Sequence, residues 1–155
     1  MGLHTVVQRA CSSPTAPANK NIRSWAKAAY EACEHPESDK ELTIRLVDEN
    51  EAGELNRAYR RKDYATNVLS FPGADESFDT GLLGDIVICP AVVEREALEQ
   101  HKALEAHWSH MVVHGVLHLC GHEHDTDAGA RRMESREKRI LAGFGFPDPY
   151  TVSDE

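Results

Sequence analysis

Residues 114–124 read His114-Gly-Val-Leu-His118-Leu-Cys-Gly121-His-Glu-His124, and this stretch decides how the chain around it folds. Its first six residues belong to an apolar segment over residues 104–119 that predicts a helix. We expect this helix to end at Gly121, because glycine tolerates the left-handed conformation of helix ends. His114 and His118 are four positions apart, so on a helix they share one face. Two imidazoles on one helix face indicate a metal site, which then needs a third donor.

Two histidines compete for the place of the third donor. On an unbroken helix the Cα atoms of His114 and His122 would lie about 12 Å apart, too far for both rings to bind one ion easily at about 2.1 Å. If the chain turns back after Gly121, His124 can reach the same ion instead. Geometry therefore favours His114, His118 and His124, and His122 stays as a second candidate. The alternative is that His114 and His118 are ordinary, partly buried histidines that bind no metal.

The predicted ligand set also indicates the kind of metal site. Three nitrogen ligands and an open fourth position are typical of catalytic zinc, whereas structural zinc sites have four protein ligands. Zinc proteases of the zincin type carry a glutamate directly after the first histidine, where it acts as general base. Gly115 stands at that position, so peptide hydrolysis by this route lacks its proton acceptor.

The rest of the chain mixes strands and helices, and its 155 residues suggest one domain over residues 1–155. Alternating or β-branched segments predict strands at residues 3–8, 41–47, 67–71 and 84–89. Helical periodicity predicts helices at residues 21–33, 49–59, 91–102, 104–119 and 127–141. We expect Asn19 or Asn21 to cap the first helix and Asp48 to cap the second.

Charge and cysteine content restrict the function. Lys and Arg number 17 against 26 Asp and Glu, so the net charge of −9 gives no general attraction to nucleic acid. A nucleic-acid role needs a local basic site, for which residues 57–62 are the candidate. The charged run at residues 131–139 is interpreted as a solvated face with internal ion pairs, and RNA or ribosome contact is the alternative.

Widely spaced cysteines and the absence of a signal peptide predict an intracellular protein with reduced thiols. We expect Cys120 to be a buried structural thiol.

Two further segments matter beside the histidine motif. Residues 59–72 read Tyr-Arg-Arg-Lys-Asp-Tyr-Ala-Thr-Asn-Val-Leu-Ser-Phe-Pro, and residues 83–89 read Leu-Gly-Asp-Ile-Val-Ile-Cys. Together with residues 114–124 they resemble the motifs of the YbeY family of bacterial metal-dependent endoribonucleases, also called rRNA maturation factors. The resemblance covers about residues 41–150. It departs from the family at His122 and Glu123, where the family usually has Tyr and Asp.

The resemblance implies a fold and a set of roles. The implied fold is α+β, with a small mixed sheet of about four strands packed against about five helices, one of them a zincin-like metal helix. The implied metal ligands are His114, His118 and His124 around one ion, which we expect to be Zn²⁺, and the implied functional arginine is Arg60. The implied activity is single-strand-type endoribonuclease action in 16S rRNA 3′-end maturation and ribosome quality control. Precursor rRNA of the small ribosomal subunit is then the substrate, a ribosomal protein or an assembly GTPase is a candidate partner, and the location is cytoplasmic, with no membrane contact.

The chemistry of the side chains fits this activity. A zinc ion can polarise a phosphoryl oxygen or lower the pKa of its water toward about 7, and the Arg60 guanidinium suits a phosphate. The candidate substrate-binding residues are Arg61, Lys62, Asn67 and Ser70. His110, one turn before His114, is either a group that supports the metal ligands or transfers protons, or an ordinary surface histidine. The alternative functions are a ribosome-assembly factor without catalysis, whose metal holds the fold, and a metallohydrolase of another bond.

Overall fold

The computed structural model describes residues 3–33, 39–60, 68–72, 81–121 and 126–150, which form an α+β domain. The elements in chain order are β1 (Leu3–Arg9), α1 (Asn19–Glu31), β2 (Lys40–Leu46), α2 (Glu49–Arg60), β3 (Val68–Pro72), β4 (Leu82–Ile88), α3 (Pro90–Glu99), α4 (Leu104–Leu119) and α5 (Asp127–Gly143). All of the predicted strands and helices are present. The predicted fold class, a mixed sheet of about four strands with about five helices, is confirmed.

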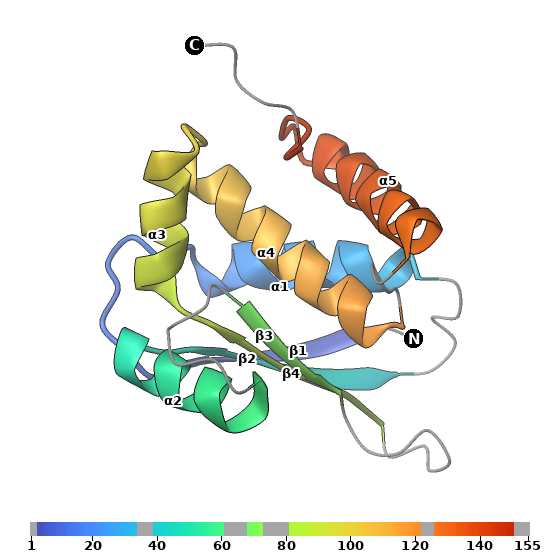
Figure 1. Ribbon diagram of the computed structural model, residues 1–155. Helices are drawn as coiled ribbons and strands as arrows, with labels where there is room; N and C mark the ends of the chain where they lie inside the picture. The colour runs from blue at the N-terminus through green and yellow to red at the C-terminus, as the bar shows by residue number, and fades with distance from the viewer. Residues whose placement is uncertain (1–2, 34–38, 61–67, 73–80, 122–125, 151–155) are drawn as a thin grey trace.

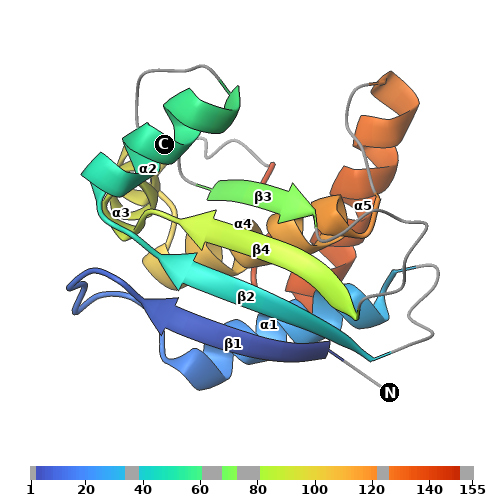
Figure 2. The same cartoon turned by 90° about the horizontal axis from the view of Figure 1, so that it is seen from below.

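The strands form one sheet in the order β1-β2-β4-β3 (Figure 2). The first three in this order are parallel to one another, and β3 pairs antiparallel with β4. The side chains of β2 alternate as its sequence predicts, with Leu42, Ile44 and Leu46 buried. In the register of the antiparallel pair Ser70 lies opposite Ile86, so these two residues share a face of the sheet.

Helices cover both faces of the sheet (Figure 1). Helices α1 and α4 lie on one face, α2 lies on the other, and α5 packs on the outer side of α4. The main core lies between the sheet and α1 and α4, and it includes Trp25, Ile44 and Trp108. A smaller cluster around Val87 lies on the α2 side.

The helix with the histidine motif approaches the sheet closely at one residue. Gly115 is buried, and a Cβ atom built there would lie 2.9 Å from Cδ1 of Ile86 on β4. Glycine at this position therefore sets the distance between α4 and the sheet. A larger side chain at this position would point into the core.

The ends of the helices were predicted with mixed success. Asp48 caps α2 as expected, since its Oδ1 accepts a hydrogen bond from the Glu51 backbone N–H at 2.9 Å. The prediction of an asparagine cap for α1 was wrong, because Ala18 is the cap and makes no side-chain bond. The Asn19 carboxamide instead accepts two hydrogen bonds from the Arg9 guanidinium.

The last two helices end and begin at residues with clear physical roles. Helix α4 ends before Gly121, whose φ of +95° is the left-handed conformation that the sequence predicted. Helix α5 begins after Thr126, whose hydroxyl accepts a hydrogen bond from the Gly129 N–H. No helix in the described ranges combines the length and the apolar character that crossing a bilayer requires.

Candidate metal centre

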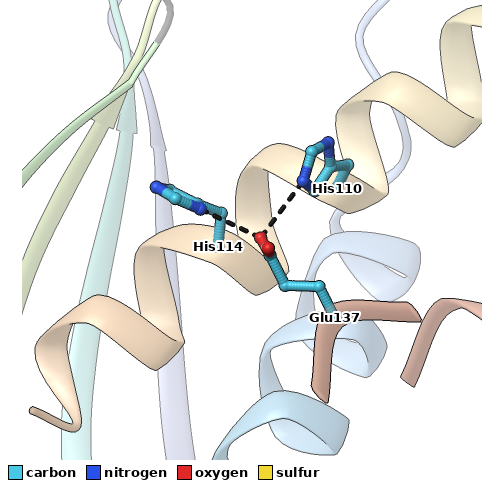
Figure 3. A group of neighbouring side chains, drawn as sticks. All are labelled: His110, His114 and Glu137. Carbon is cyan, nitrogen blue, oxygen red and sulfur yellow. Dashed lines mark hydrogen bonds and ion pairs between the residues drawn. The ribbon is translucent and has the colours of Figure 1, made fainter. Parts of the chain in front are cut away.

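A row of histidines runs along α4. His107 is buried, and its Nε2 lies 2.9 Å from a carboxylate oxygen of Glu96, which joins α4 to α3. His110 and His114 follow at one-turn intervals and face α5 (Figure 3). His118 lies in the last turn of the helix and is exposed. The row therefore passes from the core to the surface toward the end of α4.

Three polar side chains lie within hydrogen-bonding distance of the Glu137 carboxylate on α5. Its Oε2 lies 2.9 Å from Nδ1 of His114 and 3.1 Å from Nε2 of His110, and its Oε1 accepts a hydrogen bond of 2.5 Å from the Tyr150 hydroxyl. The residue has 0% exposure. A carboxylate buried this deeply needs such donors, because burial without partners is strongly unfavourable for a charge.

The donors keep this buried carboxylate ionised. Burial alone would raise the pKa of Glu137, but the hydrogen bonds and charges of His110 and His114 lower it to about 2. Burial together with the hydrogen bond to Glu137 raises the pKa of the Tyr150 phenol, which keeps the hydroxyl protonated as a donor. The three side chains around Glu137 thus act as donors to a fixed negative charge.

This arrangement determines which nitrogen of His114 carries the proton. An ionised carboxylate only accepts hydrogen bonds, so Nδ1 of His114 carries a hydrogen. When the ring loses one proton to bind a metal, the lone pair is therefore on Nε2. In Figure 3 the second ring nitrogen of His114 lies on the side away from Glu137. A histidine held by a carboxylate in this way is the usual form of a metal ligand.

A second grouping of donors is present in the same cluster. Ligand atoms of His110, His114 and Glu137 all lie within 4.8 Å of one another, so these three residues could hold a metal ion. Two imidazoles and a carboxylate are a donor set that zinc accepts. His114 thus belongs both to this group and to the predicted group with His118 and His124.

The described residues include only part of the predicted site. His114 and His118 lie on α4, whereas His124 and its competitor His122 lie outside the described residues, as do Arg61, Lys62 and Asn67. Arg60 is the last residue of α2, and its side chain is also outside the described part.

Ser70 is the substrate-binding candidate whose surroundings can be described. It is half-buried on β3, on the same sheet face as Ile86, which packs against Gly115 of α4. Asp85 is exposed and adjacent to Ile86 in the strand, so it points to the opposite face, away from the histidines. From this position Asp85 does not take part in the histidine cluster of α4.

Sequence reasoning missed two residues of the cluster and left the role of a third open. Glu137 was interpreted as part of a solvated charged face, and Tyr150 was not considered. Of the two alternatives for His110, the surface histidine is excluded, because His110 is buried and bonded to Glu137. The available signal was the buried stripe of α5, since Glu137 follows Met133 and precedes Leu141 at intervals of four.

The cysteine next to the histidine motif also differs from the prediction. Cys120 forms a disulfide with Cys33, 87 positions earlier, and so connects the end of α4 to the end of α1. Cys11 and Cys89 are free thiols. The expectation of reduced thiols was therefore wrong for this pair, whose sequence spacing gave no sign of proximity.

Comparisons with known proteins assign the family. Residues 8–145 match the family model described as "Endoribonuclease YbeY". The protein of that name from Pseudomonas putida F1 is 56% identical over 146 residues, which cover 93% of this chain and 90% of that one. Its namesake from Stutzerimonas stutzeri A1501 is 55% identical over 141 residues, or 90% and 86% of the two chains. The solution structure of TM1509 from Thermotoga maritima shares the fold, with a TM-score of 0.59 at 23% identity over 94% of this chain and 99% of that one. This chain therefore belongs to the YbeY family of endoribonucleases.

Proposed function

We propose that this protein is a metal-dependent endoribonuclease that hydrolyses phosphodiester bonds of single-stranded RNA, and that it matures the 3′ end of 16S rRNA in ribosome quality control. Membership of the family supports the reaction class. The observation that carries the proposal is the pairing of His114 Nδ1 with the buried Glu137 carboxylate. It prepares His114 to bind a metal through Nε2.

The proposed ligands are His114, His118 and His124, and the proposed metal is a single Zn²⁺ ion. When bound, zinc supplies a Lewis acid for a phosphoryl oxygen and lowers the pKa of a coordinated water. Glu137 accepts the Nδ1 proton of His114 as a hydrogen bond and so keeps the ring in the tautomer and orientation that metal binding needs. His110 and Tyr150 complete the hydrogen bonding of that carboxylate.

The remaining candidates are proposed to act on the RNA. Arg60 is the catalytic residue, whose guanidinium positions the scissile phosphate and stabilises the charge of the transition state. Arg61, Lys62, Asn67 and Ser70 bind the neighbouring parts of the substrate. Ser70 is supported by its position on the sheet face toward α4.

The buried position of Gly115 argues against a zincin-type protease. A side chain at residue 115 would point toward Ile86 in the core rather than toward a substrate, so a general base has no place there. We further propose that the protein acts in the cytoplasm and meets its RNA on the small ribosomal subunit. A ribosomal protein or an assembly GTPase is the proposed partner there.

The proposal is tested by metal analysis and RNA cleavage of matched histidine variants. His118 is exposed, so His118→Ala should fold normally, lose the metal and lose cleavage of a labelled single-stranded RNA. His4→Ala replaces an exposed histidine on β1 and serves as the control, which should keep both properties. Metal retained by His118→Ala but lost by His110→Ala would place the ion in the second grouping instead. Cleavage that survives His118→Ala and a strong chelator would reject the metal mechanism.

A further inference from the structure

One face of α5 carries a continuous row of arginines. Ala128, Arg131, Arg132, Ser135, Arg136 and Arg139 line an open hollow of about 470 Å³. Their spacing alternates between three and one, which places all six on the same side of a helix. We call this surface the arginine face. From Arg131 to Arg139 it extends about 12 Å along the helix axis.

Of the acidic residues of α5, Glu137 is turned away from the arginine face, whereas Asp127 in the first turn lies four positions before Arg131. Glu137 points into the cluster with His110 and His114, and Glu134 is not among the residues that line the hollow. Lys138 pairs with Asp148 at 3.5 Å and is not part of the face. The sequence-based interpretation of a face with internal ion pairs therefore fails for Glu137.

Three guanidinium groups of the arginine face lack a carboxylate partner among the described residues. No ion pair connects Arg131, Arg132 or Arg139 with a carboxylate in the part of the chain that the structure describes. No acidic residue is among the six that line the hollow. The whole molecule has a net charge of −9, so this group of guanidinium side chains is a positively charged patch on a negatively charged protein. It provides a local attraction for polyanions that the whole molecule lacks.

The arginine face adjoins the end of the histidine helix. Arg136 donates a hydrogen bond of 2.7 Å to the carbonyl of Ala32 at the end of α1, and the next residue, Cys33, is bonded to Cys120 just after α4. Glu137, adjacent to Arg136 in the chain, bonds His114. Helix α5 thus presents arginines on one side while another side supports the proposed metal ligand.

We propose that the arginine face binds the phosphate backbone of single-stranded RNA and holds the strand beside the cleavage site. This inference rests on the proposed function, because it takes the RNA substrate from there. Guanidinium groups match phosphate oxygens with paired donors, and a straight row of them suits a linear, repeating anion. Contacts of this kind position the strand without reading its sequence.

The experiment removes three charges from the arginine face and three from elsewhere. The test variant is Arg131→Gln/Arg132→Gln/Arg139→Gln, which leaves Arg136 and its bond to α1 intact. The control is Lys20→Gln/Lys27→Gln/Arg95→Gln, which removes the same charge from exposed positions on α1 and α3. Binding of a fluorescein-labelled, 2′-O-methylated single-stranded RNA is measured by anisotropy between 50 and 300 mM salt.

We expect the test variant to bind about tenfold more weakly at low salt. Its log–log salt slope should fall by about 2, or about 0.7 for each phosphate that the variant no longer neutralises. The control should stay close to the parent protein. The variant Arg131→Lys/Arg132→Lys/Arg139→Lys should recover much of the affinity, since it restores the charge. A test variant that binds RNA as well as the control does overturns the inference. The inference also fails if the test variant loses binding to poly-glutamate as much as it loses binding to RNA, which would indicate an acidic protein as the partner.

The same proteins separate failure of this inference from failure of the proposed function. Parent protein that binds RNA through the arginines but cleaves none would reject the nuclease activity and leave the arginine face as an RNA-binding surface. Parent protein that cleaves RNA while the test and control variants bind alike would reject the arginine face and leave the nuclease activity.

Discussion

At the scale of single residues, Glu137 controls the chemistry of the candidate metal centre. Its carboxylate is buried and stays ionised because His110, His114 and Tyr150 direct hydrogen bonds toward it. The charge in turn fixes the proton of His114 on Nδ1. The ligand atom Nε2 is thus prepared by a residue 23 positions away in the chain.

Replacing Glu137 by glutamine should weaken metal binding without abolishing it. Glutamine keeps the size of the side chain but removes its charge. Its carboxamide N–H₂ group then faces the hydrogen-bond donors that surround residue 137, so the tautomer of His114 is no longer fixed. We expect the zinc affinity to fall about 10- to 100-fold and the free energy of unfolding to fall by about 2–3 kcal/mol. Competition with a chromophoric chelator measures the first and urea denaturation the second. The matched comparison is Tyr150→Phe, which removes one donor but keeps the charge of Glu137, and it should lower the zinc affinity less. Equal zinc affinity in Glu137→Gln and the parent protein would refute the role of the carboxylate.

The low pKa of Glu137 also predicts an acid dependence of stability. A carboxyl whose pKa falls from 4.5 in the unfolded chain to about 2 in the folded protein contributes its full stabilisation above pH 4.5. That contribution is lost as the pH falls from 4.5 toward 2. Urea denaturation of the metal-free protein in this range should show a steeper loss of stability for the parent than for Glu137→Gln. Parallel curves for the two proteins would contradict this assignment.

Prediction from sequence succeeded for residues whose role depends on local spacing. His114 and His118 were found because a helix places residues four apart on one face. Glu137 could not be found in this way, because its partners come from another helix and from the C-terminal segment. Its neighbours in the chain, Arg136 and Lys138, suggested surface ion pairs, whereas packing against α4 turned it inward.

At the scale of elements, α4 is positioned by the close contact of one glycine with the sheet. The bounds of this helix agree with those that its apolar pattern and Gly121 predicted. The function of Gly115 as a spacer was not predicted, because the contact involves Ile86 of a strand that no local pattern connects to it.

A methyl group at residue 115 should therefore disturb the packing of α4. Ala is the better helix former by about 1 kcal/mol, but overpacking against Ile86 costs about 1–3 kcal/mol. We expect Gly115→Ala to lower the free energy of unfolding by about 1 kcal/mol. The double variant Gly115→Ala/Ile86→Val should lose less than the sum of the two single changes, because valine lacks the Cδ1 atom that lies 2.9 Å away. Strict additivity in thermal and urea denaturation would disprove the contact.

The disulfide connects two helix ends that enclose much of the core between them. It closes a loop of 87 positions from α1 to α4, and a crosslink of this length limits the freedom of the unfolded chain. Reduction, or the change Cys33→Ser, should lower the free energy of unfolding by about 2–4 kcal/mol. Cys11→Ser, at a half-buried free thiol, is the control and should have little effect. Identical urea midpoints with and without a reducing agent would show that the bond does not form in solution.

At the scale of the whole molecule, the sequence predicted the elements better than their arrangement. The strand order β1-β2-β4-β3 and the antiparallel β3 depend on contacts between distant segments, which periodicity does not encode. The resemblance to the family supplied the mixed sheet that composition and spacing left open. The position of the arginine face beside the end of α4 likewise emerged only from the packing of α5.

Removal of the metal should stop catalysis and leave the molecule folded. The core between the sheet and helices α1 and α4 is formed by apolar residues, while His118 lies exposed at the end of α4. The fold therefore does not depend on the ion in the way that small zinc domains do, which unfold without metal. After treatment with a strong chelator we expect loss of RNA cleavage and an unchanged far-UV circular dichroism spectrum. The thermal transition should stay cooperative but occur at a lower temperature, because a ligand that binds only the native state raises the stability of that state. Readdition of zinc should restore cleavage. A chelated protein without a cooperative transition would instead favour the alternative function, in which the metal serves to hold together an assembly factor.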